Sequence, residues 1–238
     1  MLSELKEKVY HANMDIYRQG LVIFTWGNVS GIDRDKGIVA IKPSGVDYDE
    51  LKPEDIVLVG LDGQVVEGEY RPSTDTKTHL VLYNHFESVE GIVHTHAVHS
   101  TVYAQAHKPI PCLGTTHADH FYGEIPVTGM MTDDEIGGDY ETETGRLIVR
   151  TFEEKHLNPA DVPAVLVASH GPFVWGSSVE KAVYNAVTLE EVAKMALYTS
   201  LLNSEIKAIK QTLLDKHYLR KHGKDSYYGQ KNIEGEKK

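Results

Sequence analysis

A pair of histidines follows an apolar run near the middle of the chain. His94 and His96 flank Thr95, directly after residues 91–93. If this run is an extended strand, side chains two positions apart point to the same face, so both imidazoles project together. Imidazole nitrogens are good ligands for zinc and its neighbours among the transition metals. The pair therefore predicts part of a metal site, whose remaining ligands must come from other segments.

Two further side chains could complete this metal site. His170 follows the apolar run 164–168 and precedes Gly171, where an abrupt turn would expose its ring. Asp75 lies at the expected start of a helix, and three imidazoles with this carboxylate would form a ligand set for zinc or manganese. Asp75 could equally be a helix cap, and His170 a hydrogen-bonded turn residue. Spacing alone does not select the third histidine ligand from the other candidates, His99, His107, His117 and His120.

A second group of residues has the chemistry of an anion site. Gly27 and Gly45 let the backbone approach a ligand closely, and Lys42 adds a point charge that suits phosphate. A helix that starts after Ser73 would present unpaired N–H groups and the positive end of its dipole. Each segment alone is also typical of an ordinary turn. Side-chain donors come from four positions: Asn28, Ser44, Ser73 and Thr74.

Composition and charge narrow the class of protein. The chain has 238 residues and a formal net charge of -11, which disfavours nucleic acid because surfaces that bind it are basic. Cys112 is the only cysteine, so there is no internal disulfide and no thiolate zinc cluster. No apolar stretch approaches the roughly 20 residues of a membrane span, and residues 1–10 lack the apolar core of a signal peptide. We therefore expect a cytoplasmic protein that binds neither nucleic acid nor a membrane.

The elements that must position these residues are mixed helices and strands. Hydrophobic spacing predicts a first helix over residues 2–16, which Gly20 ends, and turn residues predict hairpins over 28–41 and 56–66. The later elements are expected to be a helix over 75–86, the histidine strand, a short helix over 102–106, a strand over 164–168, and helices over 179–202 and 206–222. This order predicts one α/β domain over residues 1–238, with a central, largely antiparallel sheet flanked by helices and a loose polar tail from about residue 229.

In combination, these motifs resemble those of the class II aldolase/adducin family. The segments that carry the resemblance, in chain order, are 27–30, 42–45, 73–76, 92–96 and 169–172. The resemblance extends over nearly the whole chain and is greatest to the L-ribulose-5-phosphate 4-epimerases. It implies a class II aldolase-like fold, a homotetramer with active sites at subunit interfaces, and a zinc site of His94, His96 and His170. Asp75 stands where fuculose-phosphate aldolases carry a glutamate base.

The resemblance also implies which residues bind and transform a substrate. Asp119 resembles the acid/base aspartate of the epimerases. Tyr228 resembles a catalytic tyrosine contributed by a neighbouring subunit, and the adjacent Tyr227 stays open as an alternative. His217 and Arg220 lie three apart on the expected last helix, hence on one face, and could help to close an interface site. The residues implied to bind the substrate phosphate are Gly27, Asn28, Ser44, Gly45, Ser73 and Thr74.

Such a site suits epimerisation at C4 of a phosphorylated ketopentose. The hydrogen on C4 lies β to the C2 carbonyl and is not acidic, so simple deprotonation is difficult. The resemblance implies a retro-aldol route, in which the C3–C4 bond breaks, glycolaldehyde phosphate rotates, and re-addition inverts C4. A zinc ion, or manganese, is the expected Lewis acid. We therefore expect interconversion of L-ribulose 5-phosphate and D-xylulose 5-phosphate. The alternatives are an aldolase that cleaves a ketose 1-phosphate such as L-fuculose 1-phosphate, and a non-catalytic adducin-like module.

Overall fold

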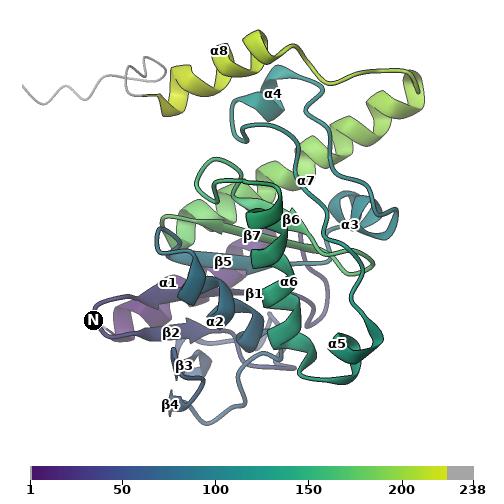
Figure 1. Cartoon of the computed structure of the whole chain (residues 1–238). Helices are drawn as coiled ribbons and strands as arrows, with labels where there is room; N and C mark the ends of the chain where they lie inside the picture. The colour runs from purple at the N-terminus through teal and green to yellow at the C-terminus, as the bar shows by residue number, and fades with distance from the viewer. Residues whose placement is uncertain (1, 224–238) are drawn as a thin grey trace, which may run out of the picture.

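A seven-stranded sheet forms the centre of the molecule (Figure 1). The structure is a computed structural model that describes residues 2–223. The strands are β1 (Asn28–Asp33), β2 (Ile38–Ile41), β3 (Val57–Gly60), β4 (Val65–Glu67), β5 (Gly91–His94), β6 (Ala164–Leu166) and β7 (Pro172–Gly176). Their order across the sheet is β4-β3-β2-β1-β5-β7-β6, and neighbouring strands are antiparallel. The predicted α/β class with a largely antiparallel sheet is confirmed, as are both hairpins.

Helices cover both faces of this sheet. They are α1 (Leu2–Arg18), α2 (Thr76–His85), α3 (Val98–Gln105), α4 (Thr115–Ala118), α5 (Asp133–Gly137), α6 (Tyr140–Glu154), α7 (Val179–Leu202) and α8 (Gln211–His222), with a 3-10 turn at Pro53–Asp55. Helices α1 and α7 pack on the face of the sheet towards which Gly31 and Gly91 are directed. Helices α2 and α6 pack against each other on the opposite face, where Ser30 contacts α2 (Figure 1). Because both faces are covered, nearly all residues of the central strands are buried, including the polar Asn28 and Ser30 of β1.

Two paired glycines bring α7 close to the sheet. Gly31 of β1 and Gly91 of β5 are partners in the strand register. A Cβ added at Gly91 would lie 2.5 Å from the Val179 Cα, and one at Gly31 would lie 2.5 Å from a Val179 methyl carbon. A larger residue at either position would push the start of α7 away from the sheet. This close approach fixes the position of β5, the strand that ends in His94.

The strand that carries the histidine pair is shorter than the sequence predicts. β5 ends at His94, and His96 lies in the following loop, so the prediction that both rings project from one strand is wrong. On one side, β1 begins at Asn28, the residue paired with His94, and on the other side only a long hydrogen bond of 3.5 Å, from the Thr95 N–H to the Pro172 oxygen at the start of β7, follows. Strand β6 likewise ends at Leu166 rather than at residue 168. Gly171 is followed by β7, a strand that was not predicted from the sequence.

Helix boundaries also differ where contacts between distant segments determine them. Helix α3 begins at Val98 rather than at residue 102. The Glu190 carboxylate of α7 accepts hydrogen bonds from the backbone N–H groups of His99 (2.8 Å) and Ser100 (3.0 Å), so a distant side chain caps this helix. Helix α7 starts and ends as predicted, whereas α8 begins at Gln211 rather than at residue 206. Helices α4, α5 and α6 were not predicted.

Helices α4 and α8 lie together at one end of the molecule, beyond the sheet (Figure 1). An extended connection between α7 and α8 carries the chain to this end. Across residues 2–223, we find no helix with the length and apolar character needed to cross a membrane.

Candidate metal and phosphate site

Three histidines from separate segments converge at one end of β5. His94 is the last residue of the strand, His96 lies two residues further on, and His170 lies in the turn between β6 and β7. One ring nitrogen from each residue lies within 4.8 Å of the others. In the part of the chain that the structure describes, this is the one group of three or more potential metal ligands so arranged. The structure therefore groups His170 with the histidine pair, which the spacing of the sequence alone could not do.

The orientation of the His94 ring is fixed by its neighbours. Its Nδ1 lies 2.9 Å from the backbone carbonyl of Pro172, and since a carbonyl only accepts, Nδ1 carries the proton. Its ring also stacks on Phe173, with 4.2 Å between ring centroids. The Nε2 of His94 therefore presents a lone pair, and it lies 3.1 Å from the Nε2 of His96. Two ring nitrogens held this close fit a shared cation, with Pro172 and Phe173 as the supports that orient a ligand.

Burial keeps the other rings of the site neutral. It lowers the pKa of His170 to about 3, and the desolvation of the ring side that faces His94 also lowers the pKa of His96, although the residue as a whole is exposed. A neutral imidazole offers a lone pair to a metal ion, whereas a protonated one does not. The donor set of His94, His96 and His170 therefore fits a divalent transition metal.

The histidines share a pocket of about 420 Å³ with the predicted phosphate-binding residues. Gly27 and Gly45 have positive φ angles of 77° and 70°, which glycine adopts at no steric cost. A Cβ at Gly27 would lie 2.7 Å from the backbone oxygen of His94, so the two motifs are in close contact. The predicted residues that line the pocket are Gly27, Asn28, Ser44, Gly45, Ser73, Thr74, Asp75, His94, His96 and His170.

Asp75 directs its carboxylate into this pocket rather than capping a helix. It occupies the residue position before α2, but its side chain makes no capping hydrogen bond. Instead its Oδ2 accepts a hydrogen bond from the Asn28 amide at 2.7 Å. Burial favours a higher pKa for Asp75, but the nearby His94 and His79 rings and the Asn28 amide outweigh burial and lower it. The helix-cap interpretation is therefore wrong, and a role for this carboxylate beside the metal stays a prediction.

Lys42 does not reach the pocket. Its side chain is buried, and its Nζ donates to the backbone oxygen of Val46 and lies 4.8 Å from the centre of the Tyr48 ring. Burial lowers the pKa of Lys42 to about 8. Lys42 is not among the residues that line the pocket, so this geometry contradicts the prediction of a direct phosphate contact. It binds the loop that carries Ser44 and Gly45 instead.

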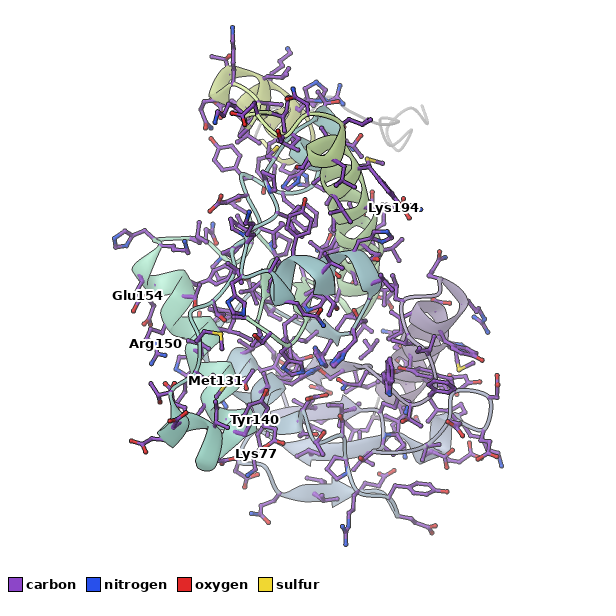
Figure 2. The ribbon with its side chains drawn as sticks, turned by 90° about the vertical axis from the view of Figure 1, so that its right-hand side faces the viewer. Lys77, Met131, Tyr140, Arg150, Glu154 and Lys194 are labelled. Carbon is purple, nitrogen blue, oxygen red and sulfur yellow. The ribbon has the colours of Figure 1, made fainter. Side chains whose placement is uncertain are left out.

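Five residues that line the pocket were not identified from the sequence. Tyr140 lies at the start of α6, where Figure 2 labels it, and its hydroxyl lies 3.5 Å from Nδ1 of His170. The helical spacing of the buried residues Leu147, Ile148 and Thr151 could have revealed α6, and hence its start beside the site. The missed residues are Thr25, Trp26, Pro43, Tyr140 and Glu141.

Asp119 lies in a second cluster, at the junction of α4 and α8. Arg220 Nη2 donates to both carboxylate oxygens at 3.0 and 2.8 Å, and His217 Nδ1 donates to one of them at 3.0 Å. Burial favours a higher pKa for Asp119, but these hydrogen bonds outweigh burial and lower it. None of the three residues lines the pocket of the histidines within one chain. The predicted tyrosines, Tyr227 and Tyr228, lie outside the described residues.

The remaining candidate histidines have partners elsewhere. His99 contacts Glu190 at 2.7 Å, and His107 contacts the Ser169 hydroxyl at 2.7 Å. His117 donates from Nε2 to the backbone oxygen of Gly123 at 2.7 Å. His120 packs against the Tyr184 ring. None of these four rings belongs to the three-histidine group.

Comparison with known proteins identifies the family. Residues 7–197 match the family described as Class II Aldolase and Adducin N-terminal domain. The chain belongs to the class II aldolase/adducin family. The L-ribulose-5-phosphate 4-epimerases UlaF of Salmonella paratyphi C (strain RKS4594) and Salmonella choleraesuis (strain SC-B67) are each 52% identical to it over 230 residues, which cover 97% of this chain and 100% of theirs. The predicted resemblance to this enzyme type is confirmed.

Solved structures of the family share the fold. An L-fuculose 1-phosphate aldolase has a TM-score of 0.76 at 25% sequence identity, over 90% of this chain and 94% of that one. The L-fuculose 1-phosphate aldolase from Glaciozyma antarctica PI12 has a TM-score of 0.74 at 18% identity, over 91% of this chain and 80% of that one. The predicted class II aldolase-like fold is therefore confirmed.

Proposed function

We propose that this protein is a metal-dependent L-ribulose-5-phosphate 4-epimerase, which interconverts L-ribulose 5-phosphate and D-xylulose 5-phosphate. The observation that carries the proposal is the shared pocket, where three converging histidines lie with the glycine, serine and threonine residues predicted to bind phosphate. The 52% identity to epimerases over nearly the full chain supports this reaction rather than another of the same fold.

The histidines would hold the metal, and the loops beside them would hold the phosphate. His94, His96 and His170 are the proposed ligands, with zinc as the expected ion and manganese as the alternative. When bound, a divalent ion acts as a Lewis acid towards the oxygens of the ketose. Gly27 and Gly45 let backbone groups approach the phosphate, and the side chains of Asn28, Ser44, Ser73 and Thr74 are its proposed donors.

The chemistry requires the C3–C4 bond to break and re-form, because the C4 hydrogen lies β to the carbonyl and is not acidic. The C4 hydroxyl loses its proton as the bond breaks and regains one after the aldehyde has presented its other face. A group that accepts this proton is therefore needed on one face of the aldehyde and a group that donates one on the other, and the two exchange roles in the reverse reaction. We assign one of these positions to Asp119 and the other to Tyr228.

Asp119 suits this task because it is held as a carboxylate. Arg220 and His217 donate hydrogen bonds to it, which orient it and keep its pKa low, so that it is ionised and can act as the proton acceptor. Since Asp119 does not line the pocket of its own chain, we propose that a neighbouring subunit supplies it. A homotetramer with active sites at subunit interfaces would meet this requirement.

The deciding experiment is incubation of the metal-loaded protein with L-ribulose 5-phosphate, followed by separation of the products. We expect D-xylulose 5-phosphate to accumulate until the two sugars reach equilibrium. Net release of dihydroxyacetone and glycolaldehyde phosphate, with no xylulose phosphate, would assign the protein to the aldolases instead. L-Fuculose 1-phosphate is the control substrate, because the structurally similar aldolase named above acts on it.

A further inference from the structure

A chain of buried polar groups lies behind the pocket. The Ser30 hydroxyl lies 2.7 Å from Nδ1 of His79 and 2.8 Å from the hydroxyl of Tyr83. Ser30 and His79 are 0% exposed, and Tyr83 is 1% exposed. The His79 Nε2 is buried with no hydrogen-bond partner among the described residues. An apolar side chain would avoid the cost of that unsatisfied nitrogen, so stability alone does not explain a histidine here.

The hydrogen bond between Ser30 and His79 lies beside the hydrogen bond between Asn28 and Asp75, and both connect β1 to the start of α2. Asn28 and Ser30 are two apart on β1 and project from the same face of the strand. Asp75 and His79 are four apart at the start of α2 and lie on the same face of the helix. Two hydrogen bonds therefore join the same strand to the same helix turn. Asn28 binds Asp75 in the pocket, and Ser30 binds His79 in the core.

His79 also lies next to the support of a metal-site histidine. Its ring packs edge-on against Phe173, with 5.9 Å between centroids. Phe173 also contacts two of the metal-site rings: it stacks on His94 at 4.2 Å and meets His170 edge-on at 6.1 Å between centroids. A shift of His79 would therefore displace two residues of the pocket. It would move Asp75 through helix α2 and His94 through Phe173.

We propose that His79 is a positioning residue for the metal site, and that its hydrogen bond to Ser30 holds the start of α2 where Asn28 can orient the Asp75 carboxylate. This role rests on the proposed function only in placing Asp75 beside a divalent ion. A carboxylate held near the ion favours its binding, so loss of the Ser30–His79 bond weakens metal affinity without removing a ligand.

The test is a Co²⁺ titration of the apoprotein, followed by visible absorption, with kcat and KM for L-ribulose 5-phosphate measured in parallel. His79→Leu removes the hydrogen bond and keeps an apolar side chain in the core. We expect its Kd for Co²⁺ to rise about tenfold, the usual effect of losing a residue that orients a metal ligand. His79→Asn places an amide near the position of Nδ1, and we expect it to restore Co²⁺ affinity to within about threefold of wild type.

Two further variants separate positioning from a general loss of stability. Tyr83→Phe removes the hydroxyl at the far end of the same chain and leaves the Ser30–His79 bond in place, so it is expected to lower the melting temperature without changing the Kd for Co²⁺. Ser30→Ala breaks the bond from the other side and should raise the Kd as His79→Leu does, with no further rise in the double variant. Ser30→Ala also provides the test if His79→Leu does not fold.

An unchanged Co²⁺ Kd in His79→Leu and Ser30→Ala would overturn the inference, as would an equal rise in Tyr83→Phe. These Kd values are measured without any sugar substrate, so they do not depend on which reaction the protein catalyses. A wild-type protein that binds Co²⁺ but does not epimerise L-ribulose 5-phosphate would overturn the proposed function and leave the comparison of Kd values intact.

Discussion

Asn28 and His94 are directly opposite each other in the β1–β5 ladder, at the end where both strands reach the pocket. Asn28 donates to Asp75 at 2.7 Å, and His94 turns its Nε2 towards His96 at 3.1 Å. A single pair in the sheet register therefore sets the spacing between the proposed phosphate site and the proposed metal site. A slip of one residue would turn one of these side chains to the opposite face of the sheet.

Substitution of His96 tests the ligand assignment. His96→Asn removes one of three converging ring nitrogens, while the residue is exposed and lies outside the strand, so the fold should be retained. We expect bound metal and epimerase activity each to fall by more than about tenfold, because even residues that only orient a ligand have effects of that size. Elemental analysis of the dialysed protein measures the metal content.

The matched control is His85→Asn, since His85 is also exposed but its ring forms its hydrogen bond with the backbone oxygen of Val81 in α2, outside the pocket. We expect this variant to keep its metal and its activity. Full metal content in His96→Asn would show that His94 and His170 bind the ion with a ligand other than His96.

The sequence predicted the elements whose signals are local. Helix α7 carries its own start signal, because the Ser178 hydroxyl accepts a hydrogen bond from the Lys181 N–H at 3.1 Å, and its bounds were predicted to the residue. Helix α3 depends on Glu190 from a distant helix, so its start was placed too late. The end of β5 depends on where β1 begins, which strand propensity does not reveal.

In the site, too, the residues with local sequence signals were predicted and those that depend on distant contacts were not. Short motifs were sufficient to find Ser44, Ser73 and their neighbours, because glycine, serine and threonine cluster in the sequence itself. Lys42 belongs to such a motif, yet its charge points into the core, and only the packing of Tyr48 over it shows this. Glu141 was missed because nothing in its neighbourhood identifies a pocket until α6 is packed against α2.

Tyr48 joins the two loops that carry the proposed phosphate ligands. It is 1% exposed, and its hydroxyl donates to the backbone oxygen of Gly27 at 3.0 Å. We expect Tyr48→Phe to raise the KM for L-ribulose 5-phosphate about threefold to tenfold with little change in kcat, since loss of one hydrogen bond is worth about 1 kcal/mol. Steady-state kinetics at fixed metal concentration give both values.

Tyr17→Phe is the control for this prediction. The Tyr17 ring stacks on Tyr48 with 5.1 Å between centroids, but its own hydroxyl contacts the exposed Asp49. Its KM should match that of the wild type. If Tyr48→Phe lowers kcat instead and leaves KM unchanged, Tyr48 does not act through the phosphate site.

Buried histidines predict that stability falls in acid. Burial lowers the pKa of His117 to about 4, whereas an unfolded histidine titrates near pH 6.5. Between these values the unfolded chain binds more protons than the native one, so stability is fully present above about pH 6.5 and falls as pH decreases towards 4. We expect His117 to contribute a slope of up to about 1.4 kcal/mol per pH unit in that range.

The measurement is urea unfolding of the apoprotein between pH 7 and pH 4.5, because apoprotein removes the separate effect of metal on the site histidines. His117→Gln supplies an amide for the Gly123 oxygen but does not titrate, so its free energy of unfolding should depend less steeply on pH. Equal slopes in wild type and His117→Gln would show that this ring does not contribute to acid sensitivity.

The separation of Asp119 from the pocket predicts complementation between subunits. His96→Asn damages the proposed metal half of a site, and Asp119→Asn damages the proposed proton-transfer half. If each site combines the two halves from different subunits, co-refolding equal amounts of the inactive variants restores about a quarter of wild-type activity, because random assembly pairs two intact halves in that fraction of sites. Mixing without unfolding is the control. Activity that stays at the level of the separate variants after co-refolding would place Asp119 in the site of its own chain or outside catalysis.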